Sequence, residues 1–144
     1  MFKELSSQLV LLFVLGAVAF AWWKGGRPER IGALFNAVVC LGVTIFQALS
    51  HKAFGTVPIL VADGILATGF LFLAFRYASL WLATAMLLQA AAFSVHGAVL
   101  MELMRPNIYF YLLMNLTSAG VIIAIIAGTA AAWLRARHHA HSPA

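Results

Sequence analysis

Charged residues are scarce in this 144-residue chain, in which aspartate, glutamate, lysine and arginine together make up only 9%. A soluble domain carries about 25% charged residues, which cover the surface that it turns toward water. Because 64% of the residues here are hydrophobic, most of the surface has to face lipid. The composition therefore predicts an integral membrane protein and excludes an ordinary soluble domain.

Cysteine and the common catalytic motifs are also lacking. Cys40 is the only cysteine, which excludes an intrachain disulfide and a cysteine-based metal cluster. The sequence contains no phosphate-binding glycine loop and no His-Glu-x-x-His, Gly-x-Ser-x-Gly or Cys-x-x-Cys pattern. We therefore assign no catalytic residue and no metal site, leave the cofactor unknown, and do not favour an enzymatic function.

All of the few charges except Asp63 lie between or beside five long apolar runs. A bilayer core about 30 Å thick needs roughly 20 apolar residues per helix, and each run has about that length. We predict an all-α, polytopic membrane bundle in which residues 1–134 form one domain and residues 135–144 a basic, histidine-rich cytoplasmic tail. The five predicted transmembrane helices, joined by short loops, are 5–23, 31–50, 57–75, 77–101 and 108–134.

The basic residues are divided unevenly between the two predicted sides of the membrane. One side holds Lys24, Arg27, Arg30, Arg76, Arg135 and Arg137, whereas the other holds Lys3, Lys52 and Arg105. The positive-inside rule places the richer side in the cytoplasm, with the N-terminus in the periplasm and the C-terminus in the cytoplasm. The tryptophans are predicted at this same cytoplasmic interface, and they are Trp22, Trp23, Trp81 and Trp133.

These lysines and arginines occur one to three at a time between apolar runs. This spacing is typical of membrane loops and not of a protein surface that binds nucleic acid. We expect Lys24, Arg27 and Arg30, in the first connection, to contact lipid headgroups.

The same connection has the sequence WKGGRPER from Trp23 to Arg30. It resembles the turn between the first two helices of small, uncharacterised bacterial inner-membrane proteins. The later order of Asp63, Trp81, Gln89 and His96 is similar to the pattern in those proteins. The resemblance implies a bundle in the bacterial inner membrane, implies no known activity, and assigns no functional residue.

Polar side chains inside the predicted spans are the candidate site, because such residues are costly in lipid and commonly functional. Gln47, Asp63, His96 and Asn115 lie on four different predicted helices, at similar depths from the outer ends. Two more polar residues share a helical face with members of this group, and they are Gln89 and His51.

Two interpretations of these six residues remain open. In the first, they line a pocket open to the outside for a quinone, a lipid headgroup, haem or a proton, with Asp63 and His96 as an acid/base pair. In the second, which we favour, Asp63 bonds to His96 and simply joins the third helix to the fourth, a contact worth around 0.6–2 kcal/mol.

Small residues recur every fourth position in the last predicted helix, at Gly120, Ala124, Gly128 and Ala132. Such a stripe allows two helices to approach closely. It can serve packing within the bundle or association with a partner helix. With no catalytic motif and little chain outside the bilayer, we predict a non-enzymatic scaffold or accessory subunit that packs against other membrane proteins or itself.

Overall fold

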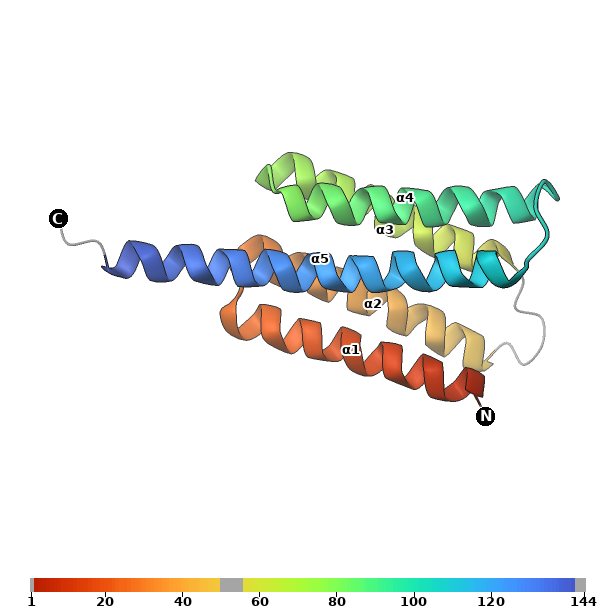
Figure 1. The fold of residues 1–144 in the computed structure, drawn as a ribbon, viewed down its shortest axis with the longest axis horizontal. Coiled ribbons are helices and arrows are strands. Elements are labelled where there is room, and N and C mark those ends of the chain that lie inside the picture. The colour runs from red at the N-terminus through yellow and green to blue at the C-terminus, as the bar shows by residue number, and fades with distance from the viewer. Residues whose placement is uncertain (1, 50–55, 142–144) are drawn as a thin grey trace.

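The computed structural model describes residues 2–49 and 56–141, and its account of side chains covers residues 12–49 and 56–138. Within these limits the chain forms a bundle of five helices (Figure 1). In chain order they are α1 (Phe2–Lys24), α2 (Arg27–Leu49), α3 (Thr56–Tyr77), α4 (Leu80–Leu100) and α5 (Ile108–His141).

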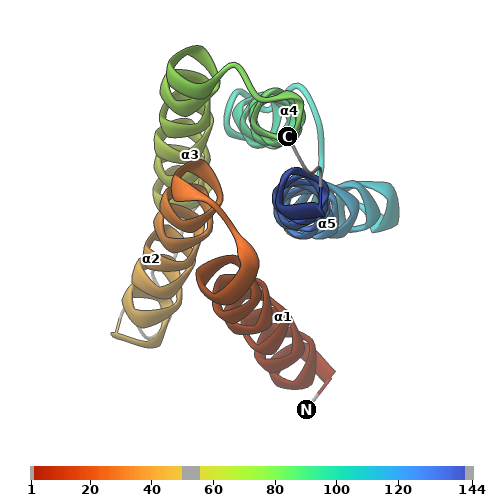
Figure 2. The same ribbon diagram turned by 90° about the vertical axis from the view of Figure 1, so that its left-hand side faces the viewer.

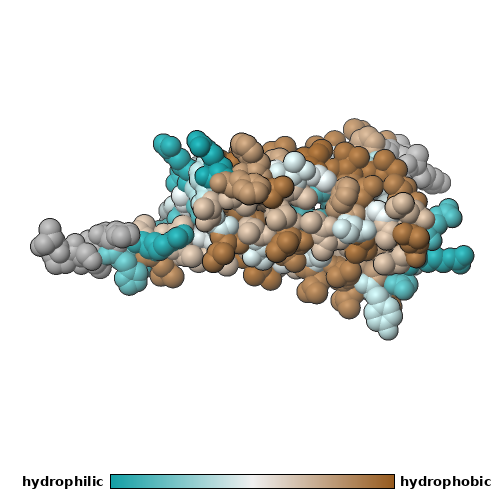
Figure 3. Space-filling model, turned by 90° about the horizontal axis from the view of Figure 1, so that it is seen from above, coloured by the Kyte–Doolittle hydropathy of each residue, from teal (hydrophilic) through white to brown (hydrophobic). Residues whose placement is uncertain are grey.

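Four of these helices, α2 to α5, are long and apolar enough to cross a membrane. In α1 the side chains are described only for Leu12–Lys24, and this part by itself is shorter than a span. Figure 3 shows a broad hydrophobic belt between two hydrophilic ends, as expected when the middle of the bundle faces lipid. The prediction of an all-α bundle is confirmed, four of its helices are long and apolar enough to span a membrane, and a fifth span through α1 stays a prediction.

The connection between α1 and α2 folds as a tight turn. The Gly25 amide donates to the Ala21 carbonyl at 2.9 Å and so extends the end of α1. A Cβ at Gly25 would lie 2.5 Å from that carbonyl oxygen, which explains why glycine is needed here. Glu29, in the first turn of α2, accepts a hydrogen bond from the Gly26 amide at 3.0 Å. This bond satisfies one of the free donors that precede a helix.

The last helix is longer than the apolar run that predicted it. α5 continues to His141, so residues 135–141 of the predicted tail are helical. Alanine and arginine in this segment favour helix, whereas the boundary at residue 134 was set by hydrophobicity alone.

The hydrophobic core is concentrated toward one end of the bundle. We call this the basic end, because it carries Lys24, Arg27, Arg30, Arg76, Arg135 and Arg137, where α1 and α3 end and α2 and α4 begin. Its core residues are Ala17, Ala21, Ala33, Leu66, Phe70, Leu73, Trp81, Leu82, Ala85, Val121, Ala124 and Ile125. Small alanines let the helices approach closely, while Phe70, Leu82 and Ile125 fill the centre.

The helices separate toward the other end of the bundle, which we call the outer end. α1 and α2 slope away from α5 toward the right of Figure 1, and Figure 2 shows the same divergence along the bundle axis. Residues 41–49 of α2 are all exposed or half-buried. In the first turns of α5, residues 108–116, only Phe110 is buried. The outer halves of these two helices are thus covered little by their own chain.

Glycine at position 128 is required by the packing of α5 against α4. A Cβ at Gly128 would collide with the Trp81 ring, whereas a Cβ at Gly16 on α1 would meet nothing within 4 Å. We predict that Gly128→Val lowers the free energy of unfolding by about 1–3 kcal/mol, the usual cost of overpacking. The control Gly16→Val makes the same change in helix propensity and should leave stability nearly unchanged. Thermal unfolding in detergent measures both, and equal losses would contradict this packing.

Candidate functional site

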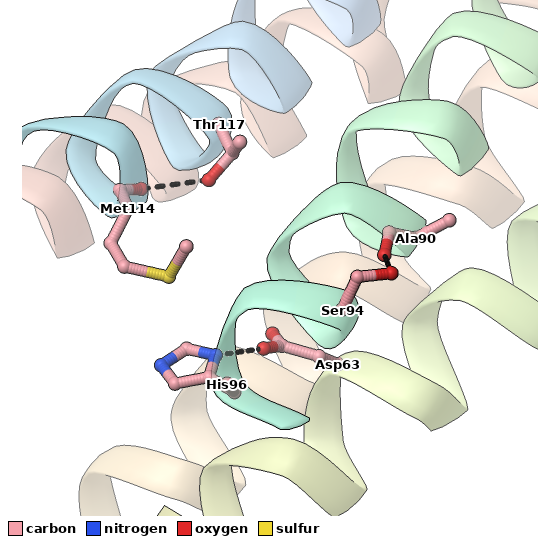
Figure 4. Close-up of polar contacts among 6 residues, drawn as sticks. All are labelled: Asp63, Ala90, Ser94, His96, Met114 and Thr117. Carbon is pink, nitrogen blue, oxygen red and sulfur yellow. Dashed lines mark hydrogen bonds and ion pairs between the residues drawn. The ribbon is translucent and has the colours of Figure 1, made fainter. Parts of the chain in front are cut away.

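Asp63 on α3 and His96 on α4 form a direct polar contact between two helices of spanning length. The Asp63 Oδ2 and His96 Nδ1 atoms are 2.6 Å apart (Figure 4). The His96 side chain is 11% exposed and the Asp63 side chain 13% exposed. Each polar group is thereby largely removed from lipid and satisfied by the other, as an interhelical contact in a membrane requires.

The surrounding packing holds this pair in place. Beside Asp63, Gly64 lets α4 come close, since a Cβ there would lie 3.1 Å from the ring of Phe93. The His96 ring also contacts the Phe110 ring of α5 edge to face, with centroids 5.5 Å apart. The imidazole is therefore fixed by α3 through a hydrogen bond and by α5 through an aromatic contact.

The pair has two further polar atoms. Figure 4 shows the second ring nitrogen of His96, Nε2, pointing away from Asp63. In the part of the chain that the structure describes, neither Nε2 nor Asp63 Oδ1 is hydrogen-bonded. Because no buried polar side-chain atom there lacks a partner, both atoms keep some exposed surface. A neutral imidazole donates its Nδ1 proton to the carboxylate, and a protonated one forms an ion pair with it. In either state the two side chains bond to each other directly, without any third group.

The other predicted site residues do not join this pair. Gln47 on α2 and Asn115 on α5 are exposed and hydrogen-bond to neither partner. Gln89 is 7% exposed, on the same helix as His96. His51 lies outside the described residues. The structure therefore brings together two of the four residues that were predicted to lie at one depth.

The described surface has an apolar groove between α2 and α3, with a volume of about 240 Å³. It is lined by Val39, Gly42, Val43, Phe46, Pro58, Val61, Ala62 and Ile65. Asp63 and His96 are not among the residues that line it. Among the described residues, no three histidine, cysteine, aspartate or glutamate side chains converge as metal ligands would. The polar pair is therefore separate from this groove.

The small-residue stripe on α5 is used inside the bundle. A Cβ at Gly120 would lie 2.8 Å from Leu88 of α4, and one at Gly128 would strike Trp81. Ala124 is 7% exposed and belongs to the core, while Ala132 is half-buried. These contacts bring α5 close to α4, as the intrachain interpretation of the stripe requires.

A buried contact between Glu29 and Trp81 was missed from the sequence. Trp81 Nε1 donates to Glu29 Oε1 at 3.2 Å, and the two residues are 8% and 2% exposed. Trp81 was grouped with the interfacial tryptophans, because it lies at the start of a predicted helix. Gly32 was the sequence feature that indicated close packing near this contact, since a glycine inside an apolar helix suggests that another helix comes near. A Cβ at Gly32 would lie 2.6 Å from the Trp81 ring.

The three predicted headgroup residues lie at the basic end. Lys24 Nζ is 4.4 Å from the centroid of the Trp23 ring. The Arg30 guanidinium lies 5.9 Å from the ring of Trp22, and its Nε donates to the Gly25 carbonyl at 3.1 Å. Arg27 is exposed. Contact with lipid headgroups stays a prediction for all three.

The contact between Asp63 and His96 predicts unequal effects of two substitutions. Asp63→Asn keeps a hydrogen-bonding group and should cost less than about 1 kcal/mol of stability. His96→Leu leaves the carboxylate without its partner in a low-dielectric site and should cost about 1–3 kcal/mol.

Thermal unfolding of the two single variants and the double variant in detergent gives the coupling energy. We expect the double variant to be more stable than the sum of the two single losses implies. Ser94→Ala is the matched control, because its hydroxyl is exposed on α4 and bonds only to the Ala90 carbonyl. Additive losses would show that the pair contributes nothing to stability.

Comparison with known proteins gives no external guide to this site. The chain matches no protein-family model, no curated protein and no solved structure. The resemblance of residues 23–30 to a turn in small bacterial inner-membrane proteins therefore stays a prediction. The functional argument rests on the contacts of the chain's own residues.

Proposed function

We propose that this chain is a non-enzymatic accessory subunit or scaffold, which packs against another membrane protein or a second copy of itself. The observation that supports this proposal is the exposure of two amide side chains, Gln47 on α2 and Asn115 on α5. Both belong to helices of spanning length. Neither has a hydrogen-bond partner within the described part of the chain.

An amide that faces hydrocarbon without a hydrogen bond is costly. Asn115 lies seven residues into α5, about 10 Å from the start of the helix at 1.5 Å per residue. A partner helix that carries a polar side chain would satisfy this amide, and such interhelical bonds are worth about 0.6–2 kcal/mol. Association therefore removes a cost that the isolated chain bears.

The surface around the two amides is suited to a partner. On α2, Leu41 and Ile45 are 47% and 51% exposed, and on α5 Leu112 and Leu116 are 63% and 65% exposed. These side chains provide apolar contact area, while hydrogen bonds from the two amides would fix the orientation of the partner. Residues 41–49 of α2 and, apart from Phe110, residues 108–116 of α5 are exposed or half-buried, so a partner can reach both helices.

The proposal includes the arrangement of the chain in the membrane. α1 is the fifth span, the N-terminus lies in the periplasm, and the basic end faces the cytoplasm of a bacterial cell. The charge difference between the two sides supports this orientation. The resemblance of residues 23–30 supports the bacterial inner membrane as the location.

Site-specific photocrosslinking tests the association. With a photoreactive phenylalanine at position 47 or 115, we expect a crosslinked product, whose mass distinguishes a second copy from a different protein. Thr84 on α4 is also exposed, but it lies near the start of α4 at the basic end, away from both amides, so the same probe at position 84 is the control and should crosslink little.

Replacing both amides by leucine should weaken the association. The expected loss is about 0.6–2 kcal/mol per amide, seen as a lower yield from a crosslinking probe at position 112. Thr84→Val should leave that yield unchanged. A monodisperse monomer that crosslinks equally from positions 47, 115 and 84 would overturn the proposal.

The orientation is tested by cysteine labelling of intact cells in a Cys40→Ser background. Arg105→Cys should react with an impermeant maleimide added from outside, whereas Arg27→Cys should react only after the cells are opened. An epitope tag at the N-terminus should be accessible from outside if α1 spans. The reverse labelling pattern would invert the orientation, and an inaccessible tag would remove the fifth span.

A further inference from the structure

At the basic end, cationic side chains and tryptophan rings from two helices meet. Lys24, the last residue of α1, has its Nζ 4.4 Å from the Trp23 centroid and 5.6 Å from the centroid of Trp133 on α5. Arg137 lies one helical turn beyond Trp133, with its guanidinium 4.6 Å from the same ring. Two cations from different helices therefore lie against one indole ring.

This arrangement is specific, because flexible side chains of like charge normally separate. Cation–π attraction of each cation to the ring offsets the repulsion between them. Trp133 on α5 is half-buried, and so has less freedom to move than a fully exposed ring. Both Lys24 and Arg137 therefore lie at the same ring before any ligand binds.

The positive charge of the pair is not neutralised by the protein. Among the described residues neither Lys24 nor Arg137 forms an ion pair. The carboxylate at this end, Glu29, is 2% exposed. Its two oxygens accept hydrogen bonds from the Gly26 amide and the Trp81 indole. Within the described residues Lys24 and Arg137 thus remain available to an anion from outside the chain.

We propose that Lys24, Arg137 and Trp133 form a binding site for the headgroup phosphate of an anionic phospholipid, with its acyl chains along the apolar surface of α1 and α5. A phosphate is recognised by a lysine ammonium and, in bidentate geometry, by an arginine guanidinium. Basic pockets at helix ends bind anionic headgroups in this way. Trp133 is the positioning residue, because both cations lie against its ring.

The lipid source follows from the location of the site. Tryptophan rings at the ends of apolar helices lie at headgroup level, and Trp23 beside Lys24 is 78% exposed. The two helices then continue as exposed apolar surface, at Leu15 on α1 and Ile126 on α5. A free phosphate would use the cations but not this surface, and this difference separates the two sources in an experiment.

Native mass spectrometry of the delipidated protein tests the site. We expect wild-type protein to retain dioleoyl-phosphatidylglycerol and to gain thermal stability from it. Dioleoyl-phosphatidylcholine and inorganic phosphate should give much weaker effects. Lys24→Gln with Arg137→Gln should lower affinity for phosphatidylglycerol roughly tenfold or more. Lys24→Arg with Arg137→Lys keeps both charges and should retain most of the binding.

The matched control is Arg76→Gln with Arg135→Gln, which removes the same charge from the same end of the bundle. Arg135 donates to the Ala131 carbonyl, and neither arginine lies over a tryptophan ring in the described part of the chain. This control should bind phosphatidylglycerol as wild type does. An equal loss in the control would show diffuse attraction and overturn the site, as would equal retention of phosphatidylcholine.

Two further measurements keep the outcome clear. Trp133→Leu keeps both charges but removes the ring, and it should weaken phosphatidylglycerol binding while the helix content measured by circular dichroism stays unchanged. If inorganic phosphate stabilises the protein as much as the lipid does, the site binds phosphate and the lipid assignment is wrong.

Discussion

The packing of Trp81 determines how the basic end of the bundle is built. Its ring, at the start of α4, fills the space left by Gly32 on α2 and Gly128 on α5. Its indole nitrogen donates to Glu29, whose other oxygen accepts from the Gly26 amide. The Trp81 side chain thus contacts both α2 and α5 from its own helix, α4. The Glu29 carboxylate accepts one hydrogen bond at the start of α2 and a second one from the Trp81 indole. Removing either partner would leave a buried polar group unpaired, which is costly at low dielectric constant.

The two ends of the bundle differ because the large core side chains are placed unevenly. Around Trp81, residues such as Phe70, Leu82 and Ile125 are almost completely buried, and alanines bring the helices into close contact. Toward the outer end the same helices diverge, and the hydrogen bond between Asp63 and His96 is the polar contact that joins α3 to α4 there. α2 has no comparable tie at that end among the described residues, so its outer half stands exposed.

This asymmetry separates two kinds of surface that have different chemistry. The basic end presents cations stacked on tryptophan rings, which suits an anionic headgroup. The outer end presents apolar side chains with two isolated amides, which suits another helix. A compact end and an open end that leaves two amides exposed are together consistent with the proposed accessory subunit.

The sequence by itself determined the membrane environment, the helical class and the approximate helix positions, because these depend on the length of the apolar runs and the placement of charge. It also indicated the pairing of Asp63 with His96, since two ionisable groups at similar depth in lipid need partners. Only the tertiary structure decided that Trp81 is buried, that Gly120 and Gly128 serve internal packing, and that Gln47 and Asn115 are exposed. A residue's depth along a helix follows from counting, but the direction of its side chain depends on how the neighbouring helices rotate and diverge. That arrangement follows from the fit of all the side chains together.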